Sequence, residues 1–244
     1  CKLYIKKLSK NSSIFSFNHK KKKPPTISFL SSEIRNHPVG FFIKDMLPEL
    51  SKRFEVIIFN TSEFEDEISL YAKKFCQWIN VQAKKEYEIA DIIYRKKVDV
   101  LVDSSGLTRT NNLGVFKLRP SNNQVSWAGW LASTNLKEMD YVISDNFCTP
   151  KKDEKFFTEK ILRMKNIWCT YSLSVLENLN LKKENNSEPF IIYGCFQRPE
   201  KITKKVISTW MNILIRVEKS KIFFINQSFN EYEKENISSH FNKK

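Results

Sequence analysis

The chain has little glycine, with only 5 Gly among 244 residues. Glycine-rich phosphate-binding loops need several glycines at fixed spacing, because the backbone must turn tightly and approach the phosphates closely. Neither G-x-G-x-x-G nor a Walker pattern occurs in the sequence. The sequence therefore excludes the glycine-rich type of nucleotide-binding loop and leaves other ways of holding an anion.

Cysteine is also scarce, and long apolar runs are absent. The five cysteines are odd in number, scattered and never in C-x-x-C spacing, which argues against a zinc site and favours reduced, mostly buried thiols. No apolar run approaches the roughly 18–20 residues of a membrane span, and we recognise no signal peptide. We therefore expect a cytoplasmic protein with no membrane partner and no metal. Because the first residue is Cys, we expect a piece of a longer protein.

Acidic residues are missing from the start of the chain. Residues 1–23 carry eight lysines and no acid, which supplies much of the net charge of +14. Such a run is typical of a solvated segment, so we predict a basic tail or linker over residues 1–25. Lys, Asn, Ile and Phe are abundant together, as AT-rich codons would produce. A nucleic-acid partner is therefore the least favoured interpretation of the charge.

Apolar residues are plentiful, at 41% with 19 Phe and 5 Trp, which is ample for a core. Short apolar stretches alternate with amphipathic ones along the chain. This alternation predicts an α/β fold with a parallel, doubly wound sheet. The predicted strands are at about 26–31, 54–60, 98–103, 124–127, 140–143 and 161–164. The predicted helices are at about 40–52, 63–78, 84–96 and 111–118.

The same alternation begins again near residue 190. A polar stretch over 172–189 is typical of a linker. It is followed by a strand at 190–193 and a helix that begins after Thr203, a favourable N-cap. The buried stripe of this helix is predicted to be Val206, Trp210, Leu214 and Val217, and a further strand follows at 222–225. We therefore predict a first lobe over 26–171 and the incomplete start of a second lobe over 190–244.

The first candidate site is the loop within residues 27–40, sequence ISFLSSEIRNHPVG. It holds one imidazole, His37, followed by Pro38, with Glu33 and Arg35 close in sequence. In open α/β sheets, ligands bind at loops that follow the carboxyl ends of strands. Taken alone, the loop does not indicate a particular reaction. The alternative to a ligand-binding loop is a solvated connection between a strand and a helix.

Five segments follow one another along the chain in a recognisable order. They are ISFLSSEIRNHPVG, VDVLVDSSGLT with NNLGVFKLRPSNNQVSWAGW, MDYVISD, FIIYGCFQRPEKIT and W-x-x-I-L-x-x-V. Together they resemble the catalytic region of the O-linked N-acetylglucosamine transferases, glycosyltransferase family 41. The resemblance implies two Rossmann-like lobes of the GT-B type with the active site between them. It also implies inverting, metal-independent transfer from a nucleotide sugar, usually UDP-N-acetylglucosamine, to a Ser or Thr hydroxyl of an acceptor protein, with tetratricopeptide repeats upstream. A related branch uses GDP-fucose, so the donor stays open.

The same resemblance implies roles for individual residues. His37 matches the active-site histidine, with Asn36 and Pro38 beside the sugar, and Glu33 stands where most members have an aspartate. Lys201 matches the lysine that binds the donor phosphates. Its position just before a helix start independently favours anions, and a cation there would stabilise the leaving diphosphate. A pyrimidine-side glutamine of the family matches Arg198.

The sequence also departs from the family pattern. Leu107 replaces the histidine of a G-H-T segment, and Leu131-Ala132 replaces a P-G pair. The later donor-binding segment of the family has no counterpart before Lys244. We therefore predict a glycosyltransferase catalytic region that transfers little sugar alone. The alternative is a non-catalytic relative that serves as a binding module.

Overall fold

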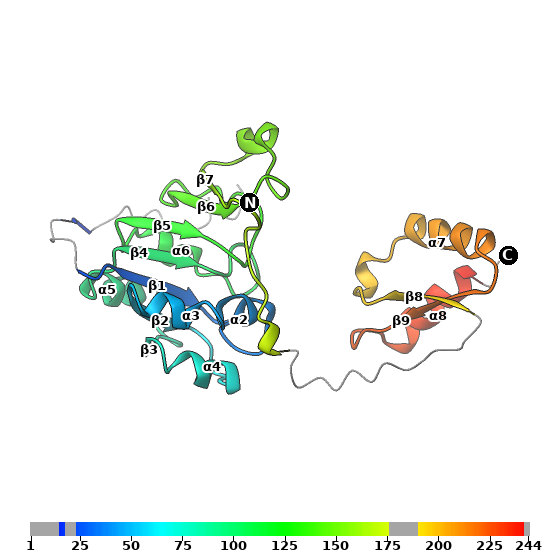
Figure 1. Ribbon diagram of the computed structural model, residues 1–244, viewed down its shortest axis with the longest axis horizontal. Coiled ribbons are helices and arrows are strands. Elements are labelled where there is room, and N and C mark those ends of the chain that lie inside the picture. The colour runs from blue at the N-terminus through cyan, green and yellow to red at the C-terminus, as the bar shows by residue number, and fades with distance from the viewer. Residues whose placement is uncertain (1–14, 18–22, 176–189, 242–244) are drawn as a thin grey trace. The chain divides into compact units, whose positions relative to one another are not determined.

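The computed structural model describes residues 15–17, 23–175 and 190–241. The chain forms two compact units, residues 1–180 and 181–244, and each is described here by itself. Figure 1 shows the elements of both units.

The first unit is built on a seven-stranded sheet in which every neighbouring pair is parallel. This confirms the predicted parallel sheet. The strands lie in the order β3-β2-β1-β4-β5-β6-β7. Their bounds are β1 Thr26–Ser31, β2 Glu55–Asn60, β3 Gln77–Asn80, β4 Val100–Asp103, β5 Asn123–Ser126, β6 Tyr141–Ser144 and β7 Lys160–Arg163.

The direction of winding reverses between β1 and β4. The chain adds β2 and β3 on one side of β1 and then returns to place β4 on the other side. Strands β1 and β4 pair from Ile27↔Val100 to Leu30↔Asp103, so their carboxyl ends lie together. In open parallel sheets this switch point is where the loops diverge and a ligand can enter.

Helices cover both faces of the sheet, and each face has its own core (Figure 1). Helices α2 Pro38–Ile43, α3 Leu47–Ser51 and α4 Glu67–Ala72 supply one core, with Ile43 and Leu47 fully buried. Helices α5 Glu86–Arg95 and α6 Leu113–Lys117 supply the other, with Ile93 and Phe116 fully buried. Burying each such side chain adds about 1.5–3 kcal/mol to the free energy of unfolding.

Two predicted helices differ from the observed elements. The predicted helix at 40–52 is divided into α2 and α3, and Pro48 lies in the first turn of α3. Proline suits that position because N–H groups in the first turn of a helix have no intrahelical acceptor, so its missing N–H costs no helical hydrogen bond. The predicted helix at 63–78 is wrong after Lys73, its C-cap, because Gln77–Asn80 form the edge strand β3.

Part of the predicted tail contacts the first unit. Phe15 stacks on Tyr94 of α5 with ring centroids 4.5 Å apart, and the Tyr94 hydroxyl donates to the Ser16 carbonyl at 2.8 Å. Residues 1–14 and 18–22 of that tail lie outside the described residues, as do 176–189 of the predicted linker. The preceding 3-10 helix η2 spans Leu173–Val175.

The cysteines are less buried than predicted. Cys195 is buried, Cys76 and Cys169 are half-buried, and Cys148 is exposed. These four are free thiols, and Cys1 lies outside the described residues. The expectation of mostly buried thiols is therefore wrong, although the expectation of reduced thiols agrees with the structure.

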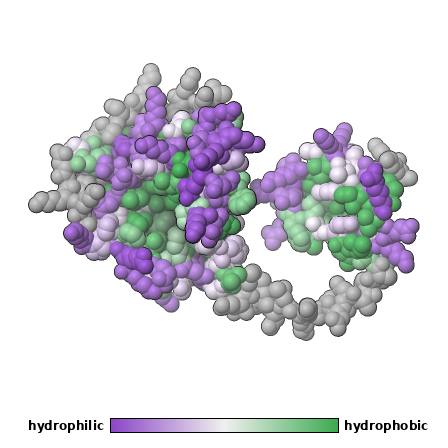
Figure 2. Space-filling view, turned by 45° about the horizontal axis from the view of Figure 1, so that its top comes forward, coloured by the Kyte–Doolittle hydropathy of each residue, from purple (hydrophilic) through white to green (hydrophobic). Residues whose placement is uncertain are grey.

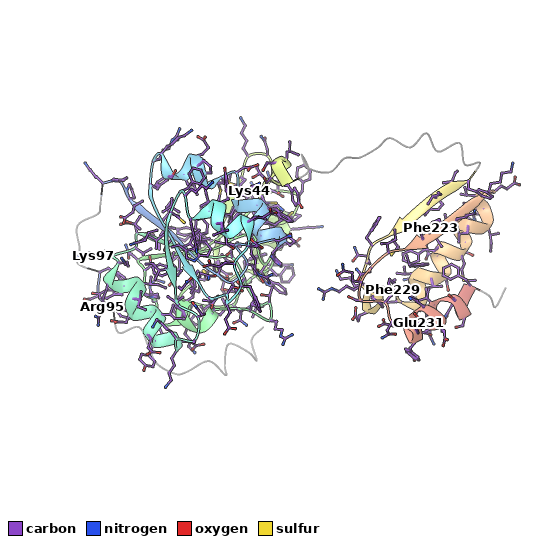
Figure 3. The ribbon with its side chains drawn as sticks, turned by 90° about the horizontal axis from the view of Figure 1, so that it is seen from below. Lys44, Arg95, Lys97, Phe223, Phe229 and Glu231 are labelled. Carbon is purple, nitrogen blue, oxygen red and sulfur yellow. The ribbon has the colours of Figure 1, made fainter. Side chains whose placement is uncertain are left out.

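The second unit contains a two-stranded parallel sheet of β8 Ile191–Cys195 and β9 Ser220–Phe224. Between them lie the 3-10 helix η3 Pro199–Lys201 and helix α7 Lys204–Arg216, and α8 Glu231–Phe241 follows β9. In α7 the fully packed residue is Ile207, whereas the four residues of the predicted stripe are half-buried. Many apolar side chains reach the surface of this unit, as Figure 2 shows. Among them is Phe223, labelled in Figure 3.

Candidate active site

The loop after β1 is held tightly against the start of α2. Inside the loop the Glu33 N–H donates to Ser31 Oγ at 3.0 Å, and the His37 N–H donates to the Arg35 carbonyl at 2.6 Å. A Cβ at Gly40 would lie 2.0 Å from the Arg35 carbonyl oxygen, so only glycine allows α2 to approach this closely. The glycine therefore fixes where the helix begins relative to the loop.

His37 is the N-cap of α2. Its backbone is extended, with φ −154°, and its Nδ1 accepts from the Val39 N–H at 3.3 Å. Pro38 follows at the first helical position. Because Nδ1 serves as an acceptor, the neutral ring carries its proton on Nε2. His37 therefore presents an N–H donor from its other nitrogen.

Glu33 joins the loop after β1 to the loop after β4. Its side chain is 9% exposed, and Oε1 accepts from the Thr110 hydroxyl at 2.8 Å. Its other oxygen, Oε2, lies 3.9 Å from His37 Nδ1. The two loops that flank the switch point are thus connected through one carboxylate. The structure places Glu33 and His37 together at the carboxyl end of β1.

The electrostatic surroundings keep His37 neutral near pH 7. Burial lowers the pKa of His37 from 6.5, Glu33 opposes this by raising it, and Arg35 lowers it further. A lowered pKa keeps Nδ1 unprotonated and able to accept from the Val39 N–H.

Asp103 shapes the loop that carries Thr110. It ends β4, is fully buried, and accepts from the N–H groups of Ser105 at 3.1 Å and Gly106 at 3.0 Å. Burial raises the pKa of Asp103 to about 6; the two N–H groups oppose the rise and the charge of Glu33 adds to it. Gly106 has φ +57°, and a Cβ there would lie 2.1 Å from Trp130 Cβ, so glycine is required.

The other predicted residues belong to neighbouring positions or to the second unit. Asn36 and Pro38 are exposed beside His37. Lys201 is the last residue of η3, and its N–H donates to the Arg198 carbonyl at 3.0 Å. Both basic side chains are exposed, just before α7, which Thr203 caps through the Val206 N–H at 3.3 Å. That Lys201 faces His37 across a cleft stays a prediction.

Three residues of this region were not singled out in the sequence. Asp103 lies inside a segment that carried the resemblance, so its position as the last strand residue before a polar turn was a usable signal. Asp66 begins a D-x-x-S capping pattern that could have marked the start of α4. Thr110 carried no local signal, because its role depends on Glu33, 77 residues away.

The described residues contain neither a cluster of metal ligands nor a membrane-spanning helix. Within 15–17, 23–175 and 190–241, no group of three or more His, Cys, Asp or Glu side chains could hold a metal ion. In the same part of the chain, no helix is both long and apolar enough to cross a membrane.

Comparison with sequence families identifies the chain. The sequence profile of glycosyl transferase family 41 matches residues 1–174, which contain β1 to β7 and the loop of His37. The chain belongs to family 41. The match also begins at residue 1, within the predicted tail.

Several curated family 41 proteins are similar to the chain. The probable UDP-N-acetylglucosamine–peptide N-acetylglucosaminyltransferase SPINDLY of Arabidopsis thaliana is 28% identical over 209 residues, covering 82% of this chain and 22% of that protein. The protein named SEC from the same plant is 25% identical over 214 residues, with the same coverage. The chain thus spans about a fifth of the length of these relatives.

A solved structure shares the fold. A mutant O-GlcNAc transferase of Thermobaculum terrenum superposes with a TM-score of 0.79 at 22% identity, covering 92% of this chain and 44% of that one. At this identity the likeness establishes the fold, which is the α/β fold of the GT-B type predicted from the sequence.

Proposed function

We propose that this family 41 chain carries part of a protein O-glycosyltransferase, which moves N-acetylglucosamine from UDP-N-acetylglucosamine to Ser or Thr hydroxyls. The observation that best supports this proposal is the cluster of Glu33, His37 and Thr110 at the switch point of the sheet. This cluster lies in a region that the family profile matches. The relatives' names supply the sugar and the peptide acceptor.

We assign His37 the role of an N–H donor to the sugar or to the acceptor hydroxyl. Its Nδ1 is occupied by the Val39 N–H, so Nε2–H is the group available to a substrate. Asn36 and Pro38 would line the sugar beside it. Glu33 would keep the ring oriented, since its carboxylate is fixed by Thr110. A donor held in place before the reaction stabilises developing charge without reorganisation.

Lys201 and Arg198 would serve the donor from the second unit. During transfer the acceptor oxygen bonds to the anomeric carbon while the bond to the diphosphate breaks, and negative charge develops on the leaving group. A cation near the start of α7 would stabilise that charge more in the transition state than in the ground state. The exposed ammonium of Lys201 suits this role.

The proposal is tested by donor binding to the chain itself. NMR spectra of the chain, with its histidine and lysine side chains isotopically labelled, would be recorded during titration with UDP-N-acetylglucosamine and, separately, GDP-fucose. We expect the uridine donor to shift the signals of His37 and Lys201 and GDP-fucose to shift them less. Unchanged signals with the uridine donor at millimolar concentration would contradict the proposal. Larger shifts of these signals with GDP-fucose would indicate that GDP-fucose is the donor instead.

A further inference from the structure

The loop of His37 is bonded to a helix that begins 30 residues later in the chain. Asp66 is the N-cap of α4, and its Oδ1 accepts from the N–H groups of Ile68 at 3.0 Å and Ser69 at 3.2 Å. Its second oxygen, Oδ2, accepts from the Asn36 N–H. One carboxylate therefore caps the helix and holds the residue that precedes His37.

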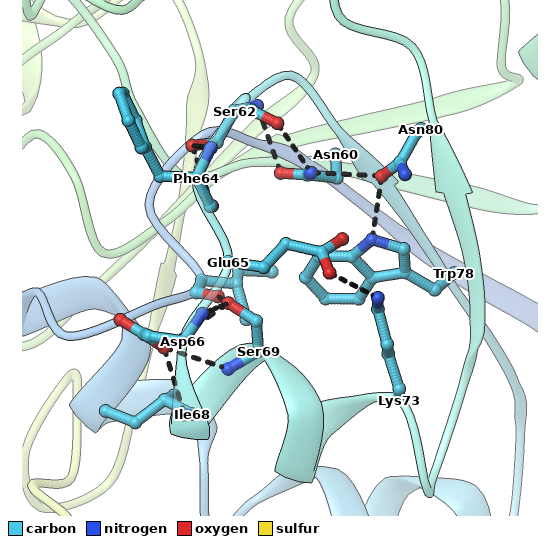
Figure 4. A network of polar contacts seen from close by, with 11 residues as sticks. Asn60, Ser62, Phe64, Glu65, Asp66, Ile68, Ser69, Lys73, Trp78 and Asn80 are labelled. Atoms are coloured by element: carbon cyan, nitrogen blue, oxygen red, sulfur yellow. Dashed lines mark hydrogen bonds and ion pairs between the residues drawn. The ribbon is translucent and has the colours of Figure 1, made fainter.

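Ser69 makes a second connection to the same loop. Its hydroxyl donates to the Ile34 carbonyl at 2.9 Å and accepts from the Asp66 N–H at 3.3 Å, closing the capping box. Figure 4 shows Asp66, Ile68 and Ser69 together at the start of α4. Ser69 is 1% exposed, so water does not compete for these bonds.

The two connections fix the loop on the amino-terminal side of the imidazole. Ile34 and Asn36 are held by α4, while on the other side His37 Nδ1 is held by the Val39 N–H. These bonds restrain the backbone on both sides of the imidazole.

The same connections place the side chain of Asn36. Its backbone is bonded to Asp66, and its exposed amide lines a polar cavity of about 330 Å³. Lys44, labelled in Figure 3, lies in the wall of this cavity, with its ammonium 5.4 Å from the Tyr71 ring centroid. The remaining wall residues are Phe41, Glu67, Ile68 and Ser174.

We propose that Asp66 is a positioning residue, which acts through the backbone of Asn36 to hold the His37 imidazole in the orientation used for sugar transfer. That Asp66 holds the backbone of Asn36 follows from the hydrogen bonds alone. The link to sugar transfer rests on the proposed function. Asp66 does not itself touch a substrate in this account.

The chemistry of the two oxygens supplies variants that separate capping from positioning. Asp66→Ser keeps a good N-cap, because Ser, Asp and Asn rank alike at that position. It has no second oxygen for the Asn36 N–H. Asp66→Asn keeps the shape and one acceptor oxygen but presents an N–H₂ donor to the Asn36 N–H, which repels it. Both variants leave α4 capped and remove the connection to the loop.

The experiment follows the His37 ring by ¹⁵N and ¹³C NMR in the 244-residue chain, with urea unfolding measured beside it. We expect the urea midpoints of both variants to stay close to that of the wild type, because α4 keeps an N-cap. We expect the fraction of the Nε2–H tautomer to fall and the pKa of His37 to rise towards 6.5. Asp91→Asn is the matched control, because it breaks the α5 ion pair with Arg95, at 2.8 Å, and should leave His37 unchanged.

Each outcome decides the proposal. A His37 ring with wild-type tautomer and pKa in both variants would overturn it. If both variants fail to fold, Asp66 is a folding residue and the proposal is also wrong. If His37 responds as expected but the uridine donor never shifts its signals, the positioning stands and the proposed function fails. In an active transferase, Asp66→Ser should lower kcat more than it changes KM.

Discussion

At the scale of single residues, the candidate site depends on which nitrogen of His37 carries a proton. The Val39 N–H donates to Nδ1 at 3.3 Å, while the Glu33 carboxylate lies 3.9 Å from the same atom. The first contact favours the Nε2–H tautomer, and the second would favour Nδ1–H. The shorter contact with directed geometry is the one to Val39, so we expect the neutral His37 ring to carry its proton on Nε2.

The tautomer of His37 is directly measurable. At pH 7.5 we expect ¹⁵N shifts of a neutral ring with the proton on Nε2, and a pKa below 6.5, because burial disfavours the charged ring. Protonation at lower pH adds a proton to Nδ1 and removes the bond from the Val39 N–H. Histidine-selective NMR over pH 4.5–8.5 checks this, with His240 of the second unit as an internal reference. A pKa above 6.5 would show that Glu33 dominates.

Asp103 should make the stability of the first unit depend on pH. Its pKa is about 6 in the folded protein against an ordinary 3.8, so the folded state holds a proton that the unfolded state has lost between those values. Stability contributed by this group is therefore present below about pH 4 and is lost as the pH rises to about 6, by roughly 3 kcal/mol at most.

Asp103→Asn removes that titration. Urea unfolding of both proteins at pH 4, 5, 6 and 7 should show the wild type losing stability relative to the variant as the pH rises. Parallel profiles for the two proteins would contradict the raised pKa of Asp103.

At the scale of elements, the sequence predicts the main strands and the α7 helix because their signals are local. Strand β1 is an apolar run that ends in Ser31, and Thr203 caps α7 as expected. Strand β3 could not be predicted, since its four residues form a strand only by pairing with β2. The bonds of Thr110 and Asp66 to the His37 loop likewise join segments 77 and 30 residues apart, and no local pattern encodes them.

The turn after β4 provides a test of how loop geometry holds the site. Gly106→Ala should destabilise the first unit by about 1–3 kcal/mol, because alanine is strained at φ +57° and its Cβ would overlap Trp130. Gly194→Ala is the matched control in the second unit, where the nearest atom to a new Cβ is a Phe196 ring carbon at 3.0 Å. Thermal unfolding of both variants compares them. Equal and small decreases in Tm for the two variants would show that the turn after β4 tolerates a side chain.

At the scale of the whole molecule, the two units differ in how completely they bury their apolar residues. The first has seven strands with cores on both faces. The described part of the second, residues 190–241, has two strands, and Ile191, Ile192 and Phe223 are 52%, 48% and 49% exposed. Under the proposed function, the exposed turn at Lys201 would leave the donor diphosphate hydrated, which would weaken its electrostatic stabilisation by that cation.

We therefore expect the 244-residue chain to transfer little or no sugar by itself. Release of UDP and labelling of Ser/Thr peptides from radiolabelled UDP-N-acetylglucosamine would measure this. The comparison is a longer protein, in which this chain is continued after Lys244 with sequence from the Thermobaculum terrenum relative, of which the present chain matches 44%. The continued protein should turn over where the chain alone does not.

The most direct test of the account is the kcat of that continued protein with His37→Ala and Lys201→Ala introduced separately, after confirming that each folds. The account predicts that each substitution lowers kcat, by on the order of a hundredfold for Lys201, because a preorganised group is removed from the developing charge. An unchanged kcat for Lys201→Ala in that protein, or robust transfer by the 244-residue chain that Lys201→Ala does not affect, would contradict the assignment of the active site.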